Sequence, residues 1–189
     1  MVTTIIDFLL LEKRTYINDN PNIVLFVKDN LYTRDFVLTN PINKAVYGYC
    51  SLYNRTALYD EINRAVAVMN YGPLLMDCVL MYEYNKKWCR PSRSIEPDAQ
   101  KLFKYYLQNR KTELELSKAK DTYTKYMTKD GIYLNNKDVL DIVNTLFKMP
   151  PTKEFNEFLN KSKSVQSQTD EKTIVEIFRR GNALYDKYY

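Results

Sequence analysis

The sequence contains no histidine, and this absence excludes more chemistry than any other feature of the composition. Catalysis by Ser-His-Asp or Cys-His groups, histidine-ligated metals and acid–base work by imidazole all need that side chain. Glycine is also scarce, with four residues at positions 48, 72, 131 and 181. Four scattered glycines form neither a GxxxxGK[ST] phosphate loop nor a GxGxxG loop. They also argue against an all-β protein, which uses glycine in hairpins and bulges.

Cysteine is nearly as scarce. Cys50, Cys78 and Cys89 are odd in number, widely spaced and form no CxxC pair. We therefore expect free thiols in a reducing compartment rather than a disulfide framework. A structural zinc site usually takes four Cys or His ligands, so none is expected here. The sequence predicts no catalytic, cofactor-binding or metal-ligating residues, and hence a protein that is not an enzyme.

Long apolar runs are missing too. The N-terminal stretch has no basic region before its apolar residues, and Asp7 interrupts it, which is not typical of a signal peptide. No run approaches the roughly 18 apolar residues of a membrane span. We expect an intracellular protein, cytoplasmic or nuclear, that is neither secreted nor inserted in a membrane.

What the sequence does contain is an ordinary globular composition with an excess of tyrosine. Hydrophobic residues make up 45% and charged residues 27%, and 17 tyrosines stand against one tryptophan. A chain of 189 residues fits one domain. Tyrosine has an apolar ring and a polar tip, which suits half-buried positions and interfaces. Tyr, Asn, Lys and Ile are also favoured by AT-rich genomes, a bias that would fit a large DNA virus or an AT-rich microbe.

Apolar residues recur at spacings of three and four along most of the chain, which predicts helices. We therefore predict a mainly α fold, a single-domain bundle of about seven to nine helices. Residues 22–38 fit either a hairpin or a helix capped by Asn20, and their β-branched and aromatic residues favour the hairpin. The predicted helices cover residues 4–16, 40–53, 56–70, 74–88, 97–127, 136–149, a short stretch after 151, and 170–189.

The polar stretch 160–169 predicts a flexible linker between a core domain, 1–159, and a C-terminal amphipathic helix, 170–189. Such a tethered helix either docks on a partner protein or a second copy, or folds back on its own core. Its apolar stripe is the candidate partner surface and consists of Ile174, Ile177, Phe178, Leu184, Tyr185 and Tyr188.

A second candidate surface is the basic–aromatic segment 84–111. It contains eight cations and two acids, Glu96 and Asp98, so its balance of 8 − 2 = +6 exceeds the +5 of the whole chain. Cations neutralise phosphates and aromatic rings stack on bases, which is how single strands are often held. The candidate phosphate or nucleic-acid contacts are Lys86, Lys87, Trp88, Arg90, Arg93, Lys101, Lys104, Arg110 and Lys111.

The sequence thus favours a non-enzymatic interaction protein, a regulator or assembly factor that binds a protein partner or forms a homo-oligomer. The alternative is a nucleic-acid-binding protein that uses segment 84–111. Neither function requires a cofactor or a metal.

Overall fold

The computed structural model describes residues 22–68 and 70–188, and it shows a mixed α/β fold instead of the predicted helical bundle. The predicted helix over residues 4–16 lies outside the described residues. The helices are α2 (Gly72–Glu83), α3 (Pro97–Asn109), α4 (Lys137–Val143), α5 (Lys153–Gln168) and α6 (Glu171–Tyr188), with a 3-10 turn at Lys111–Glu113. The strands are β1 (Val24–Asp29), β2 (Thr33–Asn40), β3 (Ala45–Asn54), β4 (Tyr59–Ala67), β5 (Trp88–Pro91), β6 (Glu115–Lys118), β7 (Tyr126–Met127), β8 (Tyr133–Leu134) and β9 (Thr145–Lys148).

Seven of the described strands form one mixed sheet in the order β1-β2-β3-β4-β5-β9-β6, and β7 and β8 form a separate hairpin. The hairpin predicted near residues 22–38 is confirmed, since β1 and β2 pair antiparallel from Val24 opposite Thr39 to Asp29 opposite Arg34. It continues through β3 and β4 as an antiparallel meander. The turn from β2 to β3 uses Lys44 at a φ of 57°, so this reversal needs no glycine.

The helices predicted over 40–53 and 56–70 are wrong, because these residues form β3 and β4. In β3, all five residues from 48 to 52 are buried. A strand covered on both faces shows no alternation of apolar and polar residues, so the usual signal for a strand is missing. The tyrosines and the valine of β3 suit a strand, but their spacing resembled that of a helix face.

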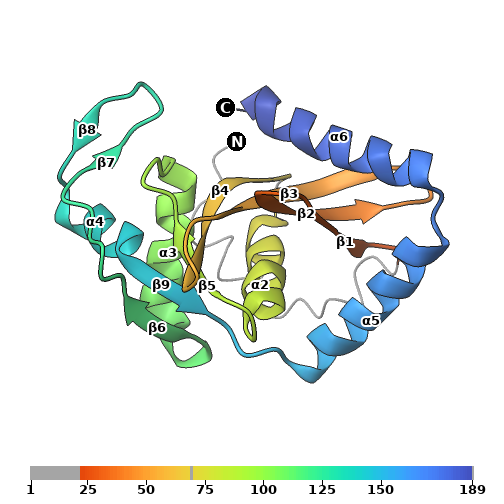
Figure 1. Ribbon diagram of the computed structural model, residues 1–189, viewed down its shortest axis with the longest axis horizontal. Helices are drawn as coiled ribbons and strands as arrows, with labels where there is room; N and C mark the ends of the chain where they lie inside the picture. The colour runs from red at the N-terminus through yellow and green to blue at the C-terminus, as the bar shows by residue number, and fades with distance from the viewer. Residues whose placement is uncertain (1–21, 69, 189) are drawn as a thin grey trace.

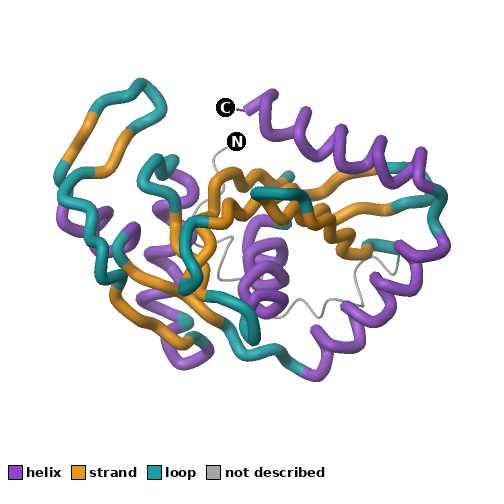
Figure 2. Tube along the Cα trace, in the orientation of Figure 1, coloured by secondary structure: helices purple, strands orange, loops and turns teal. Residues whose placement is uncertain are grey.

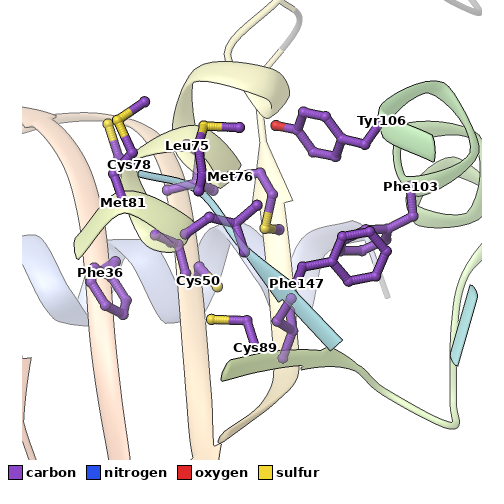
Figure 3. Close-up of a cluster of buried hydrophobic side chains, with 14 of the residues drawn as sticks. Phe36, Cys50, Leu75, Met76, Cys78, Met81, Cys89, Phe103, Tyr106 and Phe147 are labelled. Carbon is purple, nitrogen blue, oxygen red and sulfur yellow. The ribbon is translucent and has the colours of Figure 1, made fainter. Parts of the chain in front are cut away.

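The meander is the middle of three layers, with α2 on one face and α6 on the other (Figure 1). Alternate strand residues face opposite layers: Phe36 and Cys50 belong to the cluster around α2, whereas Val37 and Tyr49 belong to the cluster around α6. Figure 3 shows Phe36 and Cys50 beside the side chains of α2. The apolar run predicted as a central buried helix over 74–88 is α2, which ends at Glu83.

The second part of the sheet, β5, β9 and β6, packs with α3 and α4 (Figure 1). The long helix predicted over 97–127 ends at Asn109 as α3, and strands follow. Its Phe103 ring lies 5.0 Å from the ring of Phe147 on β9. The helix predicted over 136–149 is confirmed only in its first half, as α4, where the Asn136 side chain accepts hydrogen bonds from the first-turn amides. Its second half is wrong, because residues 145–148 form β9.

The predicted linker 160–169 is also wrong, since α5 runs through it to Gln168 and α6 follows directly (Figure 2). Polar residues of α5 form hydrogen bonds with β1, the edge strand of the sheet. The Ser162 hydroxyl accepts a hydrogen bond from the amide of Leu25. The Gln166 side-chain amide accepts one from the amide of Val27 and donates one to its carbonyl. Gln166 therefore replaces a neighbouring strand at the edge of the sheet.

We expect Gln166→Ala to lower the free energy of unfolding by about 1–2 kcal/mol, because both backbone groups of Val27 lose their partner. Urea denaturation measures this change. Asn160→Ala, at an exposed site on the same helix, serves as the control and should have little effect. Equal stability of the two variants would show that the amide does not hold the edge.

Candidate functional site

Arg90 on β5 is the most deeply buried cation of the predicted site, with an exposed fraction of 0%. Its guanidinium donates to the carbonyl of Val143 at 2.8 Å and to the Tyr59 hydroxyl at 3.0 Å. It also donates to the carbonyl of Asp121 and to the Asn144 side chain, both at 3.0 Å. The Asp121 carboxylate lies 3.2 Å from the guanidinium. Arg90 therefore ties β5 to β4, to the turn after α4 and to the segment around Asp121.

Two tyrosine rings and a second arginine extend this contact towards the surface. The Arg90 guanidinium lies over the rings of Tyr59 and Tyr123, at 5.2 and 4.0 Å from their centroids. The Arg93 guanidinium lies 5.3 Å from the Tyr123 ring and 5.0 Å from that of Tyr133. Cation–π attraction strengthens when the pair is shielded from water. Tyr59, Arg90, Tyr123, Arg93 and Tyr133 thus form an alternating series, which we call the Tyr–Arg stack.

Tyr123, the middle ring of the stack, is held at both its backbone and its hydroxyl. The Asn144 side chain accepts from the Tyr123 amide at 2.7 Å and donates to its carbonyl at 2.8 Å. The Tyr123 hydroxyl donates to the buried carboxylate of Glu61 at 3.4 Å. The same carboxylate accepts from Ser92 and Arg55. Burial, followed by the charge of Glu61, raises the pKa of Tyr123, so the ring remains neutral at physiological pH.

The outer end of the stack is the β7–β8 hairpin, which projects from the body of the molecule (Figure 1). The Arg93 side chain donates to the carbonyl of Lys125, and the amide of Met127 donates to the carbonyl of Arg93. Three consecutive apolar residues are exposed on β8 and just before it: Ile132 (57%), Tyr133 (52%) and Leu134 (43%). The stack therefore ends in an accessible aromatic ring.

The segment around this ring is basic. Residues 118–137 contain five lysines and two aspartates, a balance of 5 − 2 = +3 from twenty residues. All five lysines are exposed, namely Lys118, Lys120, Lys125, Lys129 and Lys137. Of the two acids, Asp121 is already paired with Arg90. The segment thus contains exposed lysines and an exposed aromatic ring, and one of these lysines, Lys118, pairs with Asp141 at 3.8 Å.

The predicted segment 84–111 is divided among several places. Arg90 and Arg93 lie in the stack, and the half-buried Trp88 packs with Tyr59 and Leu146. Lys87 pairs with Asp60 at 3.0 Å, and Arg110 pairs with Asp77 and Glu113. The exposed cations of the set are Lys86, at a cleft beside α2, and Lys101, Lys104 and Lys111, along and just after α3.

The predicted partner helix is confirmed as a helix, α6, but it lies on the sheet of its own chain. Ile177 and Phe178 are buried there, while Ile174, Leu184 and Tyr185 are half-buried against the same cluster. Tyr188 is exposed. A Cβ at Gly181 would lie 2.9 Å from the Tyr49 ring, so glycine permits the close approach of helix and strand. In this fold Ile177 and Phe178 are not accessible to a partner.

Five residues of the stack and its surroundings were not predicted from the sequence: Tyr59, Asp121, Tyr123, Tyr133 and Asn144. No local pattern links the first of these to Arg90, since they meet only through the pairing of β4 with β5. The basic and aromatic character of 118–137 was detectable by the same charge count that selected 84–111.

Within residues 22–68 and 70–188, no group of three or more Cys, Asp or Glu side chains is arranged to hold a metal ion. In the same described part of the chain, no helix has the length and apolar character needed to cross a membrane. Cys50, Cys78 and Cys89 are free and buried, and burial raises the pKa of each thiol.

Comparisons of the chain with protein-family models, with curated proteins and with solved structures find no match. The function must therefore be argued from the geometry of the site.

We expect Arg90→Lys to lower the free energy of unfolding by about 3 kcal/mol, because the loss of the buried guanidinium leaves its hydrogen-bond acceptors without a donor. A lysine ammonium cannot reproduce the planar set of donors. Arg93→Lys, at the half-buried second arginine, should cost much less. Denaturant unfolding of both variants measures the difference, and similar losses would argue against a special role for Arg90.

The carboxylate of Asp121 gives a pH dependence. The hydrogen bond from the Tyr59 hydroxyl, followed by its contacts with Arg90, lowers the pKa of Asp121. A lowered pKa in the folded state stabilises the protein above the ordinary aspartate range, near 3.9, and this contribution is lost as the pH falls through the folded-state pKa.

Asp121→Asn should therefore be less stable than the unmodified protein at neutral pH, and the difference should close on acidification. Urea unfolding over a pH series measures it, with Asp130→Asn in the exposed hairpin turn as the control. A difference that stays constant from neutral to acidic pH would contradict this assignment.

Proposed function

We propose that this protein is a non-enzymatic binding protein that holds single-stranded nucleic acid on the outer end of the Tyr–Arg stack. The observation that carries this proposal is the half-exposed ring of Tyr133, fixed against Arg93 in a segment that contains five exposed lysines. Sequence-tolerant binding of single strands combines aromatic rings for stacking with cations that follow the backbone. Both parts are present at this end of the molecule.

The rings are suited to stacking because they are held in place before any ligand arrives. Asn144 and Glu61 fix Tyr123, and Arg93 lies between Tyr123 and Tyr133. A base that stacks on an ordered ring loses less conformational entropy than one that must order a mobile side chain. The planar guanidinium of Arg93 can itself stack on a base.

The lysines supply the second part of the site. Lys125 and Lys129 lie on either side of β7, and Lys137 begins α4 just after β8. Neutralising a phosphate with each lysine releases a counterion, so affinity should fall with salt. The proposal keeps the basic–aromatic chemistry expected from the sequence but moves it from segment 84–111 to Arg93 and residues 118–137.

A second candidate is the protein–protein interaction that the sequence favoured. The exposed side chains of Ile132 and Leu134 support it, because neighbouring apolar residues on a projecting hairpin suit a pocket on a partner protein. If this candidate is correct for a second copy of the chain, light scattering should show a homo-oligomer that Ile132→Ser with Leu134→Ser dissociates.

For nucleic acid, we expect oligothymidine to bind with a log–log salt slope of about −0.7 for each phosphate neutralised. Tyr133→Ala should weaken binding about tenfold, since stacking contributes about 1–3 kcal/mol per base. Fluorescence anisotropy with a labelled strand measures both effects. Tyr188→Ala, at an exposed tyrosine on α6, is the matched control and should leave affinity unchanged. Binding that is absent, flat with salt or insensitive to Tyr133→Ala would exclude the proposal.

A further inference from the structure

A charged cleft lies at the C-terminal end of α2. It is lined by the β1–β2 turn, the start of β2, the end of β3 and the start of β4. Its volume is about 390 Å³, within the range of small-molecule sites. Three cations from two parts of the chain line it, Arg34 from β2 and Lys86 and Lys87 from the loop after α2. None of these groups takes part in the Tyr–Arg stack.

Two of these cations share one aromatic ring. The Lys86 ammonium lies 3.3 Å from the centroid of Tyr82, and the Arg34 guanidinium lies 5.8 Å from the same centroid. Burial lowers the pKa of Lys86, the charge of Glu83 opposes this shift, and the nearby charge of Arg34 adds to it. The Glu83 carboxylate lies near both cations, with its Oε1 2.6 Å from Arg34 and 3.9 Å from Lys86, and it offsets part of their charge.

The same two cations have hydrogen-bond donors to spare. Arg34 donates through Nε to Asp29 and through Nη1 to Glu83, while its Nη2 makes no hydrogen bond to a described residue. The Lys86 ammonium is 3.9 Å from its nearest carboxylate, too far for a hydrogen bond. Lys87 differs, because it donates to Asn54, Thr56 and Asp60 and so uses all its donors.

Two of the three acids that line the cleft are covered, and the third, Asp29, is 68% exposed. The side chains of Glu83 and Asp60 are only 1% and 9% exposed, whereas those of Arg34 and Lys86 are 24% and 39% exposed. Glu83 orients Arg34 from below, and Asp29 pairs with Arg34 at the exposed rim. A ligand therefore meets the Asp29 carboxylate at the rim and the cations Arg34 and Lys86 inside, and the charge of Lys163 also reaches Lys86.

We propose that Arg34 and Lys86 bind the phosphate group of a small phosphomonoester in this cleft. The guanidinium offers a planar pair of donors and the ammonium a point charge, the combination with which proteins commonly hold phosphate. The cleft is larger than a phosphate group, and the ring of Tyr32, 64% exposed, lies at its wall for stacking on the rest of the ligand. This site is independent of the proposed nucleic-acid surface.

Isothermal titration calorimetry with inorganic phosphate and with a nucleoside monophosphate tests the proposal on the full chain. We expect saturable binding of at least one probe, weakened about tenfold by Lys86→Met, because one charge-assisted hydrogen bond is lost. Arg34→Lys, which keeps the charge but loses the fork of donors, should also weaken it. Lys104→Met, at an exposed lysine on α3, is the matched control and should bind normally.

Tyr133→Ala separates this site from the nucleic-acid surface, and phosphate binding should be unchanged in that variant. Thermal unfolding of each variant confirms that the fold is intact. No saturable binding of either probe at millimolar concentration would overturn the proposal. Binding that Lys86→Met leaves unchanged, or that Tyr133→Ala abolishes, would overturn it as well.

Discussion

The guanidinium of Arg90 is the contact on which the rest of the site depends. An arginine removed from water is tolerated only when its donors are satisfied, and Arg90 meets this condition with four oxygens from three separate segments. It thereby fixes the chain around Asp121, which has little regular structure of its own. The Tyr123 ring then takes its place over the guanidinium, and Arg93 and Tyr133 follow. A buried charge at β5 thus determines where an exposed ring on the hairpin lies.

The two parts of the sheet have different structural roles. The β1–β4 meander is covered by α2 and α6 on its two faces and by Ser162 and Gln166 at the edge formed by β1. The β5–β9–β6 part carries Arg90 and supports the projecting hairpin. Binding residues are often found on such irregular segments positioned by a rigid scaffold. The cleft at the β1–β2 turn is lined by other residues, so the two proposed binding surfaces share no side chain.

The sequence predicted the elements whose signals are local and failed where burial or long-range pairing decides. The apolar run of α2, the cap at Asn136 and the β-branched hairpin at 22–38 were found from their own residues. The strand β3 was missed because burial on both faces removes the alternation that marks a strand. The stretch 160–169 was predicted as a linker because it is polar, yet Ser162 and Gln166 use that polarity to bind β1. Arg90 was selected as a surface contact, and only its partners from β4 and residues 121–144 reveal it as buried.

Photochemical crosslinking tests directly whether the Tyr–Arg stack presents a surface for single-stranded nucleic acid. A strand containing 4-thiouridine would be irradiated with the full-length protein, and the crosslinked peptides mapped by mass spectrometry. We expect crosslinks within residues 118–137, centred on Tyr133, and their loss at high salt. Crosslinks confined to α3 and residues 101–111, or none at all at low salt, would contradict it.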